Sequence, residues 1–239
     1  MSMSRMIKFA PKELYHLYNR GTEKRDIFMS SKDYERFLAL MYICNQSEEP
    51  VRIIRKELPE LVKIYPRKEN ELIEIAAYCL MPNHFHLLAK ERQADGISRF
   101  MHKITTAYTM YFNKKFERTG SLFQGTFKST HASNDRYLKY LISYIHLNPV
   151  KIIEPEWKEI GISDLRQAEK HLDNYKYSSY LDYQNKKRVE NNIVDKDALP
   201  KYFKSSVDFK KSIIEWLSYP HARLSLAETA RSENSEESR

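Results

Sequence analysis

The stretch from Leu72 to Lys90 constrains the fold more than any other part of this sequence. LIEIAAYCLM is a nearly continuous apolar run, Pro82-Asn83 interrupts it, and HFHLLAK follows as a second run. Two runs with a two-residue break are typical of a β-hairpin, although Pro-Asn is not among the strongest hairpin turns. We therefore expect these two runs to pair as a β-hairpin within a sheet.

Strand and helix patterns alternate on either side of this hairpin. Residues 13–20 and 121–129 read as strands, and in the second of these Gln124, Thr126 and Lys128 would share one face. We predict strands over residues 13–20, 72–81, 84–90 and 121–129, and helices over residues 30–44, 95–116 and 134–147. Strands interleaved with helices around one hairpin indicate an α+β fold, a ferredoxin-like sandwich of an antiparallel sheet with helices on one or both faces.

The length of 239 residues suits one sizeable domain with an appendage. We expect the main domain to span residues 1–158. Helical patterns in SDLRQAEKHLDN and LPKYFKSSVDFKKSIIEWLS predict a small helical C-terminal extension over residues 159–221. The polar stretch of residues 222–239 is expected to be a disordered tail.

The charge balance favours an acidic partner. The chain has 40 Lys and Arg against 32 Asp and Glu, a net charge of +8, and 17 tyrosines interleaved with the basic residues. Cations neutralise phosphates and aromatic rings stack on unpaired bases, so this composition suits nucleic acid, although a merely basic protein would look similar. There is no apolar run of about 18 residues, no signal-peptide pattern and no disulfide framework for two cysteines, so we expect a prokaryotic cytoplasmic, nucleoid-associated protein with no membrane partner.

His84 and His86 stand out within the second run of the hairpin. Side chains alternate along a strand, so the two imidazoles point the same way while Phe85 and Leu87 point the other way. Same-face neighbours lie about 7 Å apart, close enough for both rings to bind one ion. Two histidines on a solvated or hydrogen-bonded face would show the same pattern, so the pair by itself leaves both interpretations open.

We expect Asn134 to cap the helix that runs through Leu147, and this helix carries a second candidate group. Its apolar stripe should pack on the sheet, and Tyr144 and Asn148 lie together on one flank of that stripe, as an i, i+4 pair. There the tyrosine hydroxyl could meet both solvent and the sheet face. Most tyrosines in such a position are simply amphipathic boundary residues.

Three separated stretches, YCLMPNHFHLL, GSLFQGTFKS and YLKYLISYIHLNPVK, together resemble the HUH single-tyrosine transposases. In particular they resemble the branch called REP-associated tyrosine transposases, which act on repetitive extragenic palindromes. The resemblance covers about residues 10–155, including the opening LYHLYNRGTEKRDIF. It implies that His84 and His86 are metal ligands and that Tyr144 is the nucleophile. Asn148 would be the third ligand, where related transposases often carry glutamine.

This resemblance implies a transposase that cleaves and rejoins single-stranded DNA at or near palindromic hairpins. The reaction would pass through a 5′-phosphotyrosine and need one divalent metal ion, Mg²⁺ or Mn²⁺, in a monomer or homodimer. Around the predicted turn and strand of residues 113–129, the candidates for DNA contact are Lys114, Lys115, Arg118, Gln124 and Lys128. A solvated basic face would account for the cations among them equally well.

Two other functions remain open from the residues alone. One is a non-catalytic module of the same fold that binds nucleic-acid hairpins. The other is a metallohydrolase in which the histidine pair activates water, although the remaining histidines form no HxxxH or similar cluster. The joint occurrence of His84, His86, Tyr144 and Asn148 favours the transposase.

Overall fold

The computed structural model of this protein describes residues 8–46, 56–66 and 70–218. The tail predicted over residues 222–239 lies outside them. The helices and strands are, in order, β1 (Leu14–Arg20), α1 (Ser31–Cys44), α2 (Leu58–Ile64), β2 (Ile73–Met81), β3 (His84–Glu91), α3 (Gly96–Lys115), β4 (Lys128–His131), α4 (Asp135–Leu147), α5 (Trp157–Ile160), α6 (Leu165–Asn174), α7 (Tyr180–Tyr183) and α8 (Ser206–Ser218).

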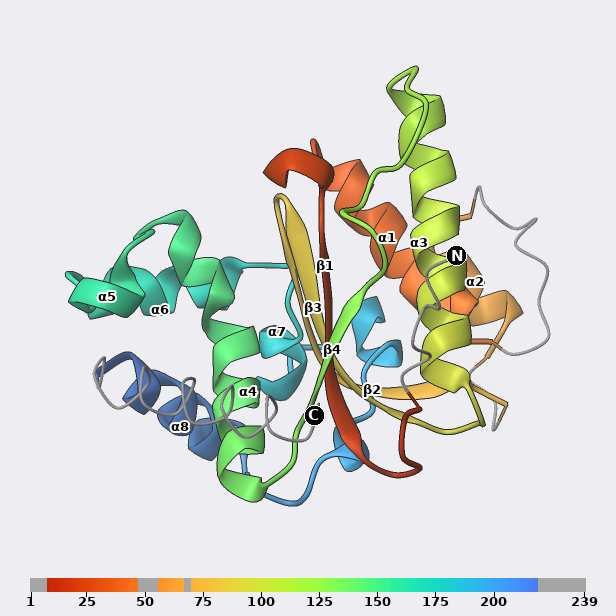
Figure 1. Ribbon diagram of the computed structural model, residues 1–239. Coiled ribbons are helices and arrows are strands. Elements are labelled where there is room, and N and C mark those ends of the chain that lie inside the picture. The colour runs from red at the N-terminus through yellow and green to blue at the C-terminus, as the bar shows by residue number, and fades with distance from the viewer. Residues whose placement is uncertain (1–7, 47–55, 67–69, 219–239) are drawn as a thin grey trace, which may run out of the picture.

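The four strands form one antiparallel sheet in the order β2-β3-β1-β4. With α1 between β1 and β2, and α3 between β3 and β4, this is the strand order of a ferredoxin-like fold. The helices α1 and α3 cover one face of the sheet, and α4 covers part of the other (Figure 1). The predicted α+β sandwich is thereby confirmed, and the predicted hairpin is formed by β2 and β3, with β2 at one edge of the sheet.

Strand alternation in β3 divides its side chains between these two helix layers. Phe85 is fully buried, and its ring centroid lies 5.0 Å from that of Phe37 on α1. His84 and His86 therefore point toward the opposite face, where α4 packs against β2 and β3. The apolar residues fix the strand in the core, and the same alternation displays the histidines on one side.

Local signals set the position of α4. The Asn134 side chain accepts a hydrogen bond from the backbone N–H of Tyr137 at 2.8 Å, which caps the first turn as predicted. The stripe that packs on the sheet is buried and consists of Leu138, Leu141, Ile142 and Ile145. The α-helix ends at Leu147, and the chain continues as one 3₁₀ turn over Asn148–Ile152.

The strand predicted over residues 121–129 is mostly wrong. Only Lys128 and Ser129 of that segment belong to β4; Phe123 makes an isolated bridge to Gly21, and residues 122 and 124–126 form bends. The chain bends at residues 124–126, and Gly125 has a positive φ of 72°, which an extended strand does not adopt. The expected common face of Gln124, Thr126 and Lys128 therefore does not form.

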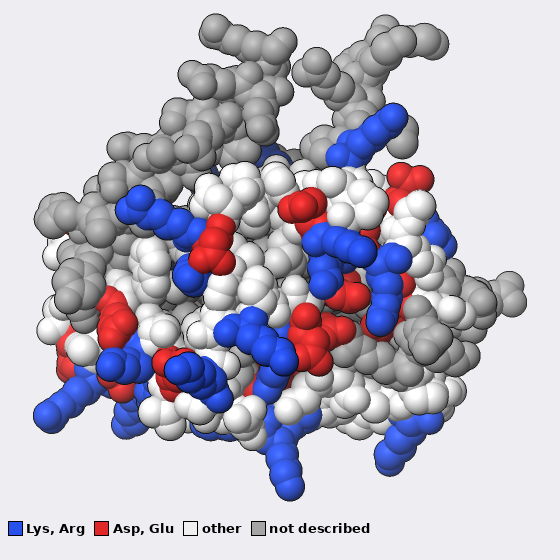
Figure 2. All heavy atoms as spheres, turned by 90° about the horizontal axis from the view of Figure 1, so that it is seen from below, with Lys and Arg blue, Asp and Glu red and all other residues white. Residues whose placement is uncertain are grey.

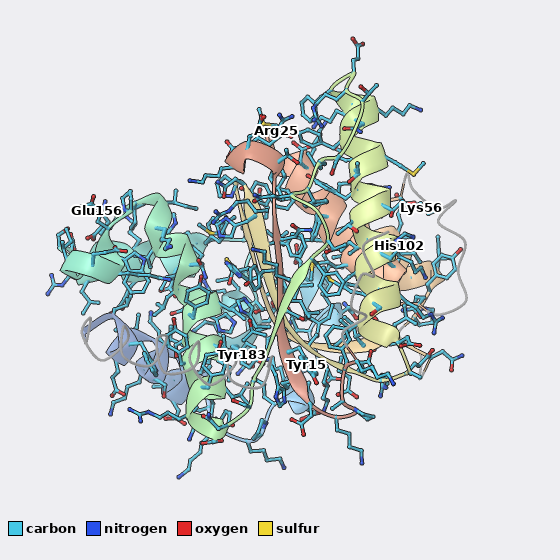
Figure 3. The ribbon with its side chains drawn as sticks, in the orientation of Figure 1. Tyr15, Arg25, Lys56, His102, Glu156 and Tyr183 are labelled. Carbon is cyan, nitrogen blue, oxygen red and sulfur yellow. The ribbon has the colours of Figure 1, made fainter. Side chains whose placement is uncertain are left out.

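The region after residue 158 covers the free edge of β2. The backbone N–H of Leu80 donates to Tyr177, that of Ser179 donates to Tyr78, and that of Asp195 donates to Ile75. Tyr183 lies between α4 and the sheet (Figure 3) and donates its hydroxyl to the carbonyl of Ala76 at 2.8 Å. Covering an edge removes unpaired backbone groups that invite aggregation. The domain boundary at residue 158 remains a prediction.

The surface seen from below carries charges of both signs. Lys and Arg side chains are interspersed there with Asp and Glu, so this face offers no single-sign patch for a polyanion (Figure 2). No helix within the described residues is both long enough and apolar enough to cross a membrane.

Candidate active site

The two histidines of β3 lie side by side on the face that α4 partly covers. Their ring centroids are 4.9 Å apart and their planes are nearly perpendicular. His86 is only 5% exposed, whereas His84 is half-buried at the start of the strand. In the sheet register His86 lies between Tyr18 of β1 and Cys79 of β2.

Each imidazole is held through its Nδ1 atom. His84 Nδ1 lies 2.6 Å from Oδ1 of Asn83, and His86 Nδ1 lies 2.8 Å from Nε2 of His16. An amide oxygen only accepts, so His84 donates from Nδ1 and keeps a lone pair on Nε2. The Nε2 atom of His86 is buried and has no hydrogen-bond partner among the described residues.

Tyr144 approaches the histidines from α4. Its ring lies edge-on to those of His86 and His16, with centroid distances of 5.3 Å and 5.9 Å. The side chain is half-buried, as expected for the flank of the apolar stripe. The structure thus brings the predicted nucleophile next to the predicted histidine pair, although Tyr144 follows His86 by 58 residues in the sequence.

Asn148 lies one helical turn beyond Tyr144 and is fully buried. Its Nδ2 atom donates to the carbonyl oxygen of Tyr144 at 2.7 Å. This bond fixes the orientation of the amide, and its Oδ1 atom is buried without a hydrogen-bond partner in the described part of the chain. An unpartnered buried oxygen is costly unless it binds something.

The electrostatics of the site keep its imidazoles neutral. Burial lowers the pKa of His84 to about 4, with smaller contributions from Arg20, Lys151 and Lys158. Burial, followed by His16 and His84, holds the pKa of His86 well below 6.5, and burial with Lys158 lowers that of His16 to about 3. Neutral imidazole is the form that binds a metal. Burial also raises the pKa of the Tyr144 hydroxyl above 10.

The donor atoms in this site fit a divalent cation. His84 keeps its Nε2 lone pair, and Nε2 of His86 and Oδ1 of Asn148 are both buried without a partner among the described residues. Imidazole nitrogens and an amide oxygen are ligands that Mn²⁺ accepts and that Mg²⁺ accepts less readily. Within the described residues, including this site, no group of three or more His, Cys, Asp and Glu side chains is placed to hold a metal.

The predicted DNA-contacting residues fall into two groups. The first group lies on and just after α3, in the helix layer across the sheet from the histidines. There Lys115 forms an ion pair with Asp33 of α1 at 2.6 Å and Arg118 donates a hydrogen bond to Asn113 at 2.8 Å, whereas Lys114 is exposed. Gln124 and Lys128 instead lie beside β1, because the backbone N–H of Gln124 donates to Arg20 and Lys128 pairs with Tyr18 in the register. Both side chains are exposed.

Three residues near the site were not found from the sequence. His16 and Tyr18 stack with centroids 4.9 Å apart on the histidine face, and Lys158 of α5 places Nζ 3.8 Å from the centroid of the Tyr144 ring. The alternation of His16 and Tyr18 within β1 was a visible signal of a shared face. Nothing local to the sequence around Lys158 indicates its contact.

Comparison with known proteins gives a family match over most of the sheet and the site. A family model described as "Transposase IS200 like" matches residues 15–148. No curated protein matches the chain. Among solved structures, a REP-associated tyrosine transposase bound to a REP hairpin is similar, with a TM-score of 0.47 and 14% identity, covering 85% of this chain and 100% of the other. The tRNA(His) guanylyltransferase of Saccharomyces cerevisiae gives a TM-score of 0.35 and 15% identity, covering 72% and 76%.

The matched residues include both histidines, Tyr144, Asn148 and all of the sheet except Leu14. They make up more than half of the 239 residues, and the motifs that suggested the family from the sequence alone lie within them or overlap them. This chain belongs to the IS200-like transposase family.

Proposed function

We propose that this protein cleaves and rejoins single-stranded DNA at or near palindromic hairpins, with Tyr144 as its nucleophile. Membership of the IS200-like transposase family supports a DNA strand-transfer reaction. The observation that carries the residue assignment is the 5.3 Å contact between the Tyr144 and His86 rings, beside two buried atoms without partners in the described residues.

The reaction exchanges one phosphodiester for another. The Tyr144 oxygen attacks the scissile phosphorus and forms a P–O bond, while the bond from phosphorus to the 3′ oxygen breaks. The tyrosine proton passes to solvent, and the released strand end takes up a proton to become a 3′-OH. The 5′-phosphate stays on the tyrosine until a new 3′-OH attacks it, so the bond energy is kept and no nucleotide cofactor is needed.

The other residues of the site orient this exchange. His84, His86 and Asn148 would hold one divalent ion, Mn²⁺ or Mg²⁺, which supplies Lewis-acid polarisation of the phosphate when bound. The hydrogen bond from Asn148 to the Tyr144 carbonyl ties the end of α4 to this ligand set. The low histidine pKa values keep both imidazoles available as neutral ligands at neutral pH.

The test is a covalent adduct. The protein is incubated with single-stranded hairpin DNA labelled at its 3′ end and Mn²⁺ or Mg²⁺, and a denaturing gel is examined for a labelled protein band. We expect an adduct with the unmodified chain, none with Tyr144→Phe, and none after chelation of the metal. A non-catalytic hairpin-binding module would retain the DNA on a native gel and give no adduct.

The neighbouring tyrosine provides a matched control. Tyr140 lies one turn before Tyr144, with ring centroids 5.8 Å apart, so Tyr140→Phe removes a similar hydroxyl from the same helix. This variant should form the adduct. Adduct formation by Tyr144→Phe would contradict the nucleophile assignment, and equal reaction of duplex DNA would contradict the single-strand specificity.

A further inference from the structure

His16 of β1 is the immediate neighbour of His86 on the sheet face. In the register Tyr18 pairs with His86 and His16 pairs with Leu88, so His16 and His86 are diagonal neighbours on one face. Their ring centroids are 5.0 Å apart with the ring planes inclined by 27°, and Nε2 of His16 lies 2.8 Å from Nδ1 of His86. Both side chains are buried. This contact is therefore a hydrogen bond within the sheet.

One proton lies between these two nitrogens, and its position decides what His86 can bind. A neutral imidazole carries one N–H. If His16 donated, Nδ1 of His86 would accept and the proton of His86 would sit on Nε2, where it blocks metal binding. If His86 donates from Nδ1, its buried Nε2 atom keeps a lone pair facing the site.

His84 shows the same arrangement with an unambiguous partner. Its Nδ1 atom bonds to Oδ1 of Asn83, which is an acceptor, so its Nε2 atom carries the lone pair. The two imidazoles are thus each held at Nδ1 by a neighbouring side chain. A partner on the second nitrogen is what commonly fixes the tautomer and ring orientation of a metal-binding histidine.

We infer that His16 is the positioning residue of His86: it accepts the Nδ1 proton and so leaves Nε2 of His86 as the ligand atom. His16 does for His86 what Asn83 does for His84. The inference rests on the proposed function for the identity of His86 as a ligand. It adds a residue of β1 to a proposed ligand set that comes from β3 and from the 3₁₀ turn after α4.

The first experiment reads the tautomer directly in the metal-free protein. Histidine is labelled with ¹⁵N, and the ring signals of His86 are assigned by their loss in His86→Gln. We expect the proton of His86 on Nδ1 in the unmodified chain. A proton on Nε2 would overturn the inference, whatever the protein does with DNA.

The second experiment measures Mn²⁺ binding by calorimetry in two variants of His16. His16→Phe keeps an aromatic ring and removes the acceptor, and we expect about 10- to 100-fold weaker binding, the usual cost of losing such a partner. His16→Gln offers an amide oxygen and should recover most of the affinity. Unchanged binding in His16→Phe would overturn the inference.

Controls separate a positioning role from a general loss of structure. His131→Gln changes a histidine of β4 that bonds to Glu13, and it should bind Mn²⁺ as the unmodified chain does. The melting temperature of each variant is compared in the absence of metal. If the unmodified chain binds Mn²⁺ no better than His84→Ala does, the metal-binding part of the proposed function fails, and the His86 tautomer still decides the role of His16.

Discussion

Lys158 holds its ammonium group over the ring of Tyr144, with Nζ 3.8 Å from the ring centroid. The lysine belongs to the short helix α5, which follows the residues matched by the family model. A cation over an aromatic face is attracted by the ring, and a desolvated contact contributes more than an exposed one. The C-terminal part of the chain therefore contributes a charge to a site whose other residues lie within residues 15–148.

We expect Lys158→Met to slow adduct formation roughly tenfold, because a partly desolvated contact of this kind contributes about 1 to 2 kcal/mol. The charge also lies where a DNA phosphate must approach Tyr144. The rate is measured from the labelled adduct on denaturing gels. Lys158→Arg should retain most of the activity, and Lys170→Met, on α6, should match the unmodified chain. A normal rate in Lys158→Met would leave the lysine with a packing role only.

Asn148→Ala should weaken Mn²⁺ binding about tenfold or more and reduce adduct formation with it, because the variant removes a proposed ligand atom. Calorimetry and the adduct gel measure the two effects. Asn174 provides the control. Its Nδ2 atom donates to the carbonyl of Lys170, one turn earlier, at 2.7 Å, as Asn148 does to Tyr144, but it lies on a helix away from the histidines. Asn174→Ala should leave both quantities unchanged. A full affinity in Asn148→Ala would remove this residue from the ligand set.

Lys128→Gln should weaken binding of single-stranded DNA, whereas Lys114→Gln should not. Both side chains are exposed. Lys128 lies opposite Tyr18 in the sheet that carries His84 and His86, whereas Lys114 lies on α3, on the other side of that sheet. Losing one phosphate contact lowers the slope of log affinity against log salt by about 0.7 for single strands. Fluorescence anisotropy of a labelled oligonucleotide at several salt concentrations measures that slope. Equal effects of the two variants would contradict this placement of the DNA.

Asp33→Asn should destabilise the protein at neutral pH by about 2 kcal/mol, since a buried carboxylate loses charge-assisted hydrogen bonds. Burial raises the pKa of Asp33, but Lys115, Tyr111 and Ser30 outweigh it, and the net pKa lies below 3.8. A carboxylate whose pKa is lower in the folded than in the unfolded state stabilises the fold at any pH above its unfolded-state pKa. This stability is lost as the pH falls through its folded-state pKa. The difference from the unmodified chain should therefore shrink below about pH 4.

Urea unfolding at neutral and acidic pH measures this difference. Asp135→Asn is the control, because its carboxylate pairs with Lys139 on the surface and should matter little at either pH. A destabilisation by Asp33→Asn that stays constant from pH 7 to pH 3 would show that the charge of Asp33 is not its cause.

Local patterns were enough to predict much of the geometry of the candidate site. A period of two placed His84 and His86 on one face, and a period of 3.6 placed Tyr144 and Asn148 on one flank of their helix. The Asn134 cap is a local signal as well, and it was predicted correctly. The strand over residues 121–129 failed because the chain bends at residues 124–126, where Gly125 has a positive φ, so the apparent alternation is not kept.

The sequence by itself determined which side chains share a face, because that depends only on the repeat of the backbone within one element. The tertiary structure decided which faces meet. His16 and His86 are 70 residues apart, and only the pairing of β1 with β3 makes them partners. Lys158 reaches Tyr144 only because α5 comes back to α4. Such contacts depend on long-range register and packing, which no local repeat encodes.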